Sequence, residues 1–365
     1  MSTDLATLLG KKKQRDDDDL EKDDDADAEE EKPKSKRKNR KTKEEKDAEE
    51  AQQQILFEEK YKCDYETYII ERVDTKPSRM NPEKNVIVIK WLNDKCPPSE
   101  YLAKMGQATQ RLAIASRGVQ GEHGWLAEQK KRCMTSSIIA RVACVSEPHV
   151  SANIRVMQSQ QVLLEQAKLL PKFEGNELTE HGKNMEPFAR KVYMQERAKQ
   201  PVIQIGFIQH PTNPLCGASP DGVTLDGTRL VELKCPKQRY FQEGNSTPLG
   251  YWHQIRFQIE VCAAATACSQ YPNGMITHCD YFECRHMKRP RGLRTNCVHI
   301  MRDKYWFESV EPMIAQYDVH LRRLRKLRSL FPNHIFEESH AQQTAARFQV
   351  NNTMPIMFKA VKLEE

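Results

Sequence analysis

A stretch near the middle of the chain, CGASPDGVTLDGTRLVELKCP at 216–236, constrains the fold more than any other. The dipeptide Asp226-Gly227 is a strong turn signal, and apolar residues flank it on both sides. The stretch therefore predicts a β-hairpin, with one strand beginning at 223–225 and the other returning over 229–234.

Three chemically active side chains lie around this predicted hairpin. Because side chains alternate along a strand, Glu232 and Lys234 share one face of the returning strand and Leu233 points to the other. Asp221 comes just before the first strand and reaches the same end of the hairpin. The sequence therefore predicts that an aspartate, a glutamate and a lysine converge there.

This set of side chains suits one kind of chemistry. Two carboxylates are the ligands that a hard divalent cation such as Mg²⁺ or Mn²⁺ prefers. An ammonium group beside them orients or deprotonates a nucleophilic water and balances developing phosphate charge. The pattern is similar to the PD-(D/E)xK arrangement of metal-dependent nucleases. The short motif alone is also compatible with a surface hairpin that carries a salt bridge.

The wider context narrows these alternatives. The segments GASPDG and VELKCP and the aromatic pair Tyr240-Phe241 closely resemble the core of the lambda exonuclease family, also called YqaJ-like viral recombinases or alkaline exonucleases. The resemblance extends in order through five segments between Trp125 and Leu330. It implies an α/β, restriction-endonuclease-like core, with a mixed central sheet flanked by helices, and a site for two Mg²⁺ (or Mn²⁺) ions. The interval between Asp221 and Glu232 is one residue longer than in the phage enzyme.

A third acid is predicted on a helix over 180–198. Its apolar residues recur with a period near 3.6, which indicates a helix packed on the core. Glu186 stands beside this apolar stripe, where a capping or salt-bridging role is the simplest interpretation. The pattern G-K-x-x-E-x-x-A resembles the family helix that supplies a further carboxylate to the metal centre. The resemblance thus implies a metal site formed by Asp221, Glu232, Glu186 and the Leu233 carbonyl.

A helix predicted over 251–268 carries polar residues on one side. Gln254 and Gln258 are i and i+4 neighbours and share a face. The family has a Gln-x-Gln pair here, in which Gln254 matches the first glutamine and Arg256 replaces the second. The resemblance implies that Gln254 orients water or a phosphate, and that Arg256 adds a DNA contact.

The stretch 125–142 combines cations with small hydroxyl side chains. Ser136 or Ser137 is positioned to cap a helix, and a helix N-terminus beside cations binds anions; a surface turn with a capping serine is the alternative. The stretch resembles the family segment W…R-x-G-x-x-T-A-S, which contacts DNA phosphates. The implied DNA-binding residues are Lys130, Lys131, Arg132 and Ser137.

Charge is distributed unevenly along the chain. The formal net charge is +6, but residues 16–31 are almost wholly acidic, so the remainder is more basic than the total implies. A basic body favours a polyanionic partner. No apolar run is long enough for a transmembrane helix, and the N-terminus lacks the apolar core of a signal peptide. Eleven cysteines without a CxxC motif favour free thiols in a reducing compartment, so we expect a nuclear or viral-replication location and no secretion.

Composition and the family resemblance together predict four regions, of which the resemblance implies the nuclease domain. Residues 1–52 form a disordered charged arm with a possible nuclear-import signal at 32–41. Residues 53–121 form an accessory N-terminal region, 122–331 the nuclease domain and 332–365 a C-terminal tail. Further elements are predicted as a buried strand at 85–92, a strand at 201–207, helices at 101–117, 151–170 and 310–331, and strands at 275–283 and 296–301 around a basic loop at 285–294. Cysteines and histidines between 278 and 299 indicate either core thiols or a zinc site.

The predicted function is a metal-dependent DNA exonuclease of recombination, repair or viral DNA processing. The resemblance alone implies 5′→3′ digestion from double-stranded DNA ends, a single-strand annealing protein as partner and a homo-oligomer, since the phage relative forms a ring. The alternatives are an endonuclease or an RNA-degrading nuclease of the same fold, and a non-catalytic DNA-binding scaffold. The presence of Asp221, Glu232 and Lys234 together argues against the scaffold.

Overall fold

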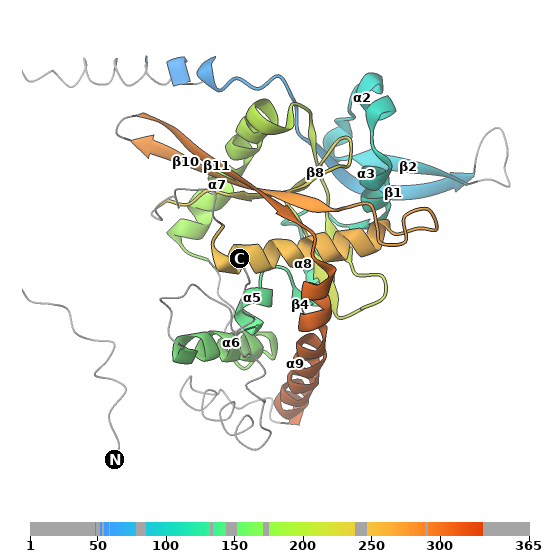
Figure 1. Cartoon of the computed structure of the whole chain (residues 1–365), viewed down its shortest axis with the longest axis vertical. Helices are drawn as coiled ribbons and strands as arrows, with labels where there is room; N and C mark the ends of the chain where they lie inside the picture. The colour runs from blue at the N-terminus through green and yellow to red at the C-terminus, as the bar shows by residue number, and fades with distance from the viewer. Residues whose placement is uncertain are drawn as a thin grey trace, which may run out of the picture. The chain divides into compact units, whose positions relative to one another are not determined.

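The fold is described from a computed structural model (Figure 1). It describes residues 48, 52, 55–57, 59–77, 85–131, 134–143, 152–170, 175–237, 247–288 and 291–330. The chain divides into two units, Met1–Gln52 and Gln53–Glu365, and the elements below belong to the second. The predicted disordered arm, its import signal and the tail at 332–365 lie outside the described residues, and so does Arg132. No described helix is long and apolar enough to cross a membrane.

A seven-stranded sheet forms the centre of the fold, in the order β11-β10-β9-β8-β5-β1-β2. Pairs β9·β10 and β1·β5 are parallel and the other pairs are antiparallel, so the sheet is mixed. This confirms the predicted α/β class with a mixed sheet. The strands are β1 (Tyr68–Pro77), β2 (Asn85–Trp91), β5 (Val202–Gln204), β8 (Gly222–Thr224), β9 (Leu230–Lys234), β10 (His278–Lys288) and β11 (Arg291–Met301).

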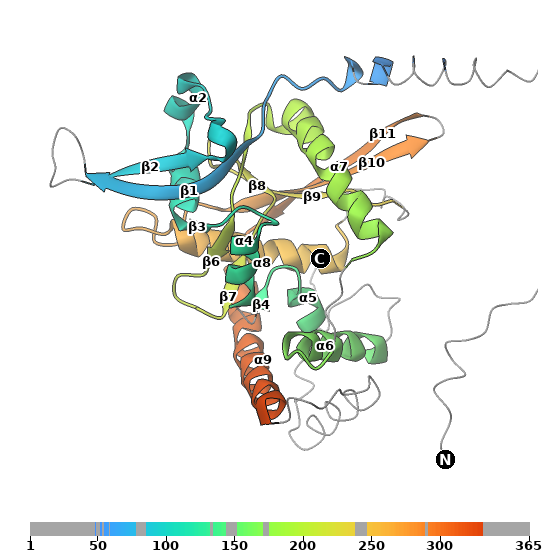
Figure 2. The same cartoon turned by 180° about the vertical axis from the view of Figure 1, so that it is seen from behind.

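Two helices cover opposite faces of this sheet (Figures 1 and 2). Helix α7 (Glu177–Tyr193) packs in one apolar cluster with Val231 and Leu233 of β9. Helix α8 (Leu249–Thr266) packs in another cluster, which includes Leu230. Odd and even positions of β9 therefore face different helices, as strand alternation requires. Further helices include α4 (His123–Lys130), α6 (Ala152–Gln166) and α9 (Lys304–Leu330).

A smaller, four-stranded sheet has the order β3-β6-β7-β4. Its strands are β3 (Ser116–Arg117), β4 (Met134–Thr135), β6 (Phe207–Gln209) and β7 (Cys216–Ala218). The prediction of one strand over 201–207 is wrong, because β5 and β6 belong to different sheets. The chain changes sheet at Gly206, where a Cβ would lie 1.8 Å from the carbonyl oxygen of Gly118. Only glycine permits this approach of two backbones.

The predicted helix over 101–117 is also interrupted. It forms α2 (Ser99–Lys104) and α3 (Gln107–Ala115), with a break at Gly106. The N–H of Gly106 donates to the Leu225 carbonyl over 2.9 Å, and a Cβ there would lie 1.8 Å from the carbonyl oxygen of Asp226. The break therefore lets the chain pass directly against the turn of the β8–β9 hairpin.

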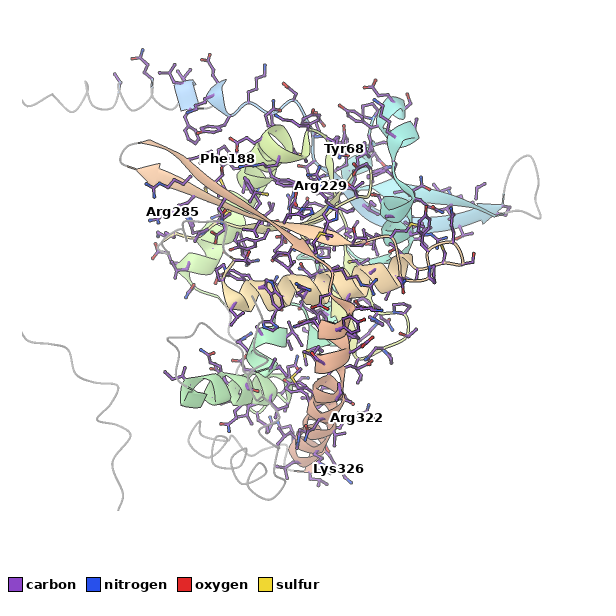
Figure 3. The ribbon with its side chains drawn as sticks, in the orientation of Figure 1. Tyr68, Phe188, Arg229, Arg285, Arg322 and Lys326 are labelled. Carbon is purple, nitrogen blue, oxygen red and sulfur yellow. The ribbon has the colours of Figure 1, made fainter. Side chains whose placement is uncertain are left out.

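Two further predictions about burial and loops are wrong. The strand expected to be buried, β2, is an edge strand paired with β1, and its Val86 and Ile87 are 44% and 54% exposed. The basic loop expected at 285–294 is largely β structure, since β10 and β11 pair as far as Lys288 and Arg291. Two arginines within that stretch, Arg285 and Arg294, are register partners, and Arg285 is labelled on β10 in Figure 3.

The predicted helices at 151–170, 180–198, 251–268 and 310–331 are confirmed as α6, α7, α8 and α9, with a π-helical turn at Met194–Ala198 after α7. Arg322 and Lys326 project from α9 (Figure 3). Among the predicted cysteine and histidine residues, Cys279 and Cys284 are buried in the core.

Candidate active site

The central hairpin forms as predicted. Strands β8 and β9 pair antiparallel, with Gly222 opposite Val231. The turn passes through Gly227 at φ 73°, a left-handed conformation that favours glycine. Asp221 lies just before β8, and its N–H donates to the Val231 carbonyl over 3.1 Å, which extends the pairing by one bond.

The Asp221 carboxylate is held at the end of this hairpin. The side chain is buried, and its Oδ2 accepts a 2.7 Å hydrogen bond from the N–H of Leu233. Its Oδ1 accepts from Nε2 of Gln120 at 3.4 Å. The interval between Asp221 and Glu232 is one residue longer than in the phage enzyme. The hydrogen bond to Leu233 nevertheless holds Asp221 against β9, the strand that carries Glu232 and Lys234.

Glu232 and Lys234 point to the same face of β9, as predicted, and form an ion pair. That face is covered by α8, from which two amides reach the Glu232 carboxylate. Gln254 donates to Oε1 over 2.5 Å and Gln258 donates to Oε2 over 2.8 Å. Both oxygens of this buried carboxylate are therefore fixed by side chains one helical turn apart.

The pKa values of Glu232 and Lys234 both lie above their ordinary values. Burial, followed by the charge of Asp221, raises the pKa of Glu232 to about 7, although Lys234 opposes the shift. Burial acts to lower the pKa of Lys234, but the charges of Glu232 and Asp221 outweigh it and raise that pKa above its usual value. The Lys234 ammonium also lies 5.1 Å from the ring centroid of Tyr251. Lys234 is therefore held as a cation beside two carboxylates.

Glu186 approaches the hairpin from α7. Burial and then the charge of Asp221 raise its pKa, while Arg190 and Lys234 act in the opposite direction. Its Oε1 lies 2.5 Å from a guanidinium nitrogen of Arg190. The structure thus brings Glu186, Asp221, Glu232 and Lys234 close enough for their charges to interact.

Other predicted site residues lie apart from the carboxylates. Arg256 stacks on Trp252, with its guanidinium carbon 4.3 Å from the ring centroid, and pairs with Asp303 at 3.2 Å. Residues i and i+2 of a helix point in nearly opposite directions, so Arg256 cannot accompany Gln254. Gln258, one turn further along, takes that place.

The predicted phosphate-binding segment lies beside the smaller sheet. Thr135 of β4 pairs with Gly217, three residues before Pro220, where the Pro-Asp turn (Pro220-Asp221) begins. Ser137 is exposed and its hydroxyl lies 3.2 Å from that of Thr135. The predicted serine cap is wrong, because the short helix that follows begins at Ile139 without a side-chain cap.

Lys130 is the last residue of α4, and Lys131, directly after it, pairs with Glu128 at 2.5 Å. The indole N–H of Trp125 donates to the Ser219 hydroxyl over 3.0 Å, which ties α4 to the segment before Asp221. Neither the Trp125 contact nor the Gln120 contact was predicted, since both join residues about a hundred positions apart.

The three acids fit a hard metal ion by their chemistry. All three offer carboxylate oxygens, and Asp221 raises the pKa of both Glu186 and Glu232, a repulsion that a cation would relieve. As they stand, no group of three or more histidine, cysteine or acidic side chains in the described part of the chain is arranged to hold a metal. Both Glu232 oxygens instead bind side-chain donors.

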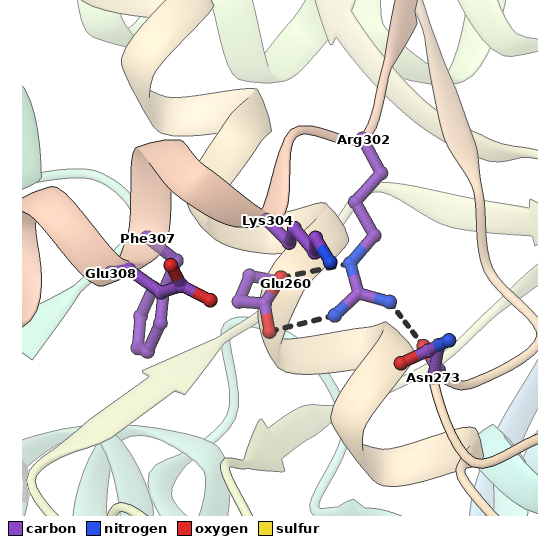
Figure 4. Close-up of a pocket in the computed structure, with 6 residues that line it drawn as sticks. All are labelled: Glu260, Asn273, Arg302, Lys304, Phe307 and Glu308. Carbon is purple, nitrogen blue, oxygen red and sulfur yellow. Dashed lines mark hydrogen bonds and ion pairs between the residues drawn. The ribbon is translucent and has the colours of Figure 1, made fainter.

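A pocket of about 460 Å³ lies between α8 and the start of α9 (Figure 4). Its wall contains an ion pair in which Arg302 binds Glu260 through two nitrogens, at 2.8 and 2.9 Å. None of the four residues at the hairpin site lines it. The lining residues are Glu260, Asn273, Arg302, Lys304, Phe307 and Glu308.

Several solved structures resemble this chain. An alkaline exonuclease from Laribacter hongkongensis is 22% identical, with a TM-score of 0.40 over 62% of this chain and 100% of that one. The structure of that exonuclease in complex with dAMP is 22% identical, with a TM-score of 0.39 over 56% of this chain and 95% of that one. A phage-related exonuclease from Haemophilus somnus 129PT is 13% identical, with a TM-score of 0.36 over 52% of this chain and 94% of that one.

No curated protein sequence matches the chain significantly. A family model does match, over residues 124–269, and its description is the YqaJ-like viral recombinase domain. The matched part contains the hairpin, Glu186 and both glutamines of α8. This match supports the predicted family over residues 124–269, which are similar to the YqaJ-like viral recombinase domain.

Proposed function

We propose that the protein is a metal-dependent DNA exonuclease. The observation that carries this proposal is the convergence of Asp221, Glu232 and Lys234 on one hairpin within a YqaJ-like domain. A buried site with two acids and a lysine held as a cation is suited to hydrolysis of a phosphodiester.

Each residue has a proposed role. Asp221, Glu232, Glu186 and the Leu233 carbonyl would hold Mg²⁺ or Mn²⁺, in two ions. When bound, such ions polarise the phosphate and lower the pKa of a bound water. Lys234 positions the attacking water and balances negative charge at the phosphate. Gln254 orients Glu232 and a water or phosphate oxygen at the same face.

The substrate proposal is more specific than the chemistry. We propose 5′→3′ digestion of double-stranded DNA ends, in recombination, repair or viral DNA processing. Lys130, Lys131, Arg132, Ser137 and Arg256 are the proposed DNA contacts. A single-strand annealing partner, a homo-oligomer and a nuclear or viral-replication location belong to the same proposal.

The test uses full-length protein with Mg²⁺ and end-labelled linear duplex DNA. A closed circular duplex and an RNA of equal length are digested in parallel, and Lys234→Ala is the inactive variant. We expect the linear duplex to shorten progressively, with the circle and RNA intact and the variant inactive. Labels at the 5′ or 3′ end then report the direction.

Three results would contradict the proposal in different ways. Cleavage of the circle would indicate an endonuclease, and cleavage of the RNA a ribonuclease. Binding of DNA without cleavage of any substrate would indicate a scaffold. To separate loss of chemistry from loss of folding, Lys237→Ala serves as a matched control, because this lysine lies three residues beyond Lys234 and pairs with the exposed Glu177.

A further inference from the structure

Arg190 is a buried cation whose contacts join three parts of the site. It is 3% exposed, and one nitrogen of its guanidinium lies 2.5 Å from Oε1 of Glu186. The same nitrogen donates to the backbone carbonyl of Asp221 over 3.4 Å. When the side-chain amide of Gln204 is oriented with its oxygen toward Arg190, that oxygen accepts hydrogen bonds from both terminal nitrogens of the guanidinium, at 2.8 and 3.3 Å. One side chain thus connects α7, β5 and the Pro-Asp turn.

The part of α7 that carries Glu186 lies at the margin of the core, where Phe188 is half-buried and stacks on Phe57. Residues 177–180 are exposed, and the buried residues of the helix begin only at Ala189. Pro187 follows Glu186 inside the helix and has no N–H to donate to the carbonyl four residues earlier. The backbone there lacks a bond that an ordinary helix would have. The ion pair with Arg190 is one contact that fixes the direction of the Glu186 side chain.

The negative charge of Asp221 makes it unfavourable for the Glu186 carboxylate to point toward it unless a cation lies nearby. Asp221 and Glu186 carry like charges that repel each other. The guanidinium of Arg190 lies 2.5 Å from the Glu186 carboxylate and offsets this repulsion. Its flat, forked donor set binds Glu186, the Asp221 carbonyl and the Gln204 amide at the same time, which a flexible ammonium does less well.

We propose that Arg190 is a positioning residue that holds Glu186 toward Asp221, and so prepares the third carboxylate for a divalent cation. This inference rests on the proposed function, because it assumes that these acids bind a metal. Arg190 itself would contact neither metal nor DNA. Residues that orient metal ligands commonly change metal affinity about 10- to 100-fold when they are mutated.

The test is a double-mutant cycle on Mn²⁺ affinity, measured by electron paramagnetic resonance of free Mn²⁺ in full-length protein without DNA. The variants are Arg190→Met, Glu186→Gln and the double variant. We expect Arg190→Met to weaken Mn²⁺ binding roughly 10-fold or more. In the Glu186→Gln background the same change should have little further effect, because Arg190 acts through Glu186.

The matched control is Arg229→Met, which removes another partly buried arginine of the same sheet region. Arg229, labelled in Figure 3, pairs with Asp280 at 3.2 Å and directly precedes β9, at the turn end of the hairpin. We expect it to leave Mn²⁺ affinity unchanged. Arg190→Lys keeps the charge but loses the fork, and should weaken Mn²⁺ binding less than Arg190→Met. It replaces Arg190→Met in the cycle if the methionine variant does not fold.

The outcomes separate this inference from the proposed function. Unchanged Mn²⁺ affinity in Arg190→Met, or an equal loss in both backgrounds, would overturn the positioning role while leaving the metal site intact. Absence of Mn²⁺ binding by the wild type would overturn both. A loss that disappears in the Glu186→Gln background would support the inference.

Discussion

Lowering the pH below 6.5 should destabilise the protein through one histidine of α8. Nδ1 of His253 accepts a 3.0 Å hydrogen bond from the indole N–H of Trp306, so this nitrogen carries no proton. The contact joins α8 to α9. Protonation at Nδ1 would replace an acceptor with a donor and place two N–H groups against each other.

The size of the effect follows from the pKa. Burial, followed by the nearby charge of Arg256, lowers the pKa of His253 to about 4, whereas an unfolded histidine titrates near 6.5. Between these values the unfolded chain binds more protons than the folded chain, so stability falls as the pH falls. The stabilisation is fully present above about pH 6.5. At about pH 5 the expected loss at this site is about 2 kcal/mol, and it levels off below about pH 4.

The assay is urea unfolding of the full-length protein at about pH 7 and about pH 5. His253→Asn retains an acceptor for Trp306 but cannot be protonated. The free energy of unfolding that this variant loses between about pH 7 and about pH 5 should therefore be about 2 kcal/mol smaller than the wild-type loss. His123→Asn, on the exposed start of α4, should behave like the wild type. An equal loss in wild type and His253→Asn would refute the reasoning.

Three further outcomes are expected from single substitutions. Gly106→Ala would place a methyl group 1.8 Å from the Asp226 carbonyl oxygen, and the displaced hairpin should cost about 1–3 kcal/mol in urea unfolding; normal stability would contradict that contact. Gln258→Leu leaves one oxygen of the buried Glu232 unpaired and should lower nuclease activity about 10- to 100-fold with the fold retained in circular dichroism, so full activity would exclude its role. Leu112→Ala opens a cavity in the core and should lower the free energy of unfolding by about 2–5 kcal/mol, and a smaller change would mean that the site collapses.

The hairpin could be predicted because its signals are local. Asp226-Gly227 fixes the turn, and strand alternation places Glu232 and Lys234 on one face. Both deductions use neighbours within a few residues. The core-packed helices could be predicted for the same reason, since a period of 3.6 depends only on short spacings. Local rules were sufficient for the part of the site that lies on one element.

Breaks in the elements could not be predicted, because distant backbone causes them. Gly106 interrupts a helix only because the turn at Asp226 lies against it, and Gly206 separates two strands only because Gly118 approaches. In the sequence each is a single glycine within an otherwise continuous pattern. Similarly, the apolar run of β2 gave no sign that the strand lies at an edge of the sheet.

Sequence reasoning also failed to identify which side chains of α8 reach Glu232. A family pattern directed attention to Arg256, the position two residues after Gln254, but helix geometry turns that side chain toward Asp303. Gln258 reaches Glu232 instead, because an i+4 spacing returns to the same face. Position in a motif and direction in space are therefore separate properties. Where they disagree, the periodicity of the element identifies which side chain can reach the site.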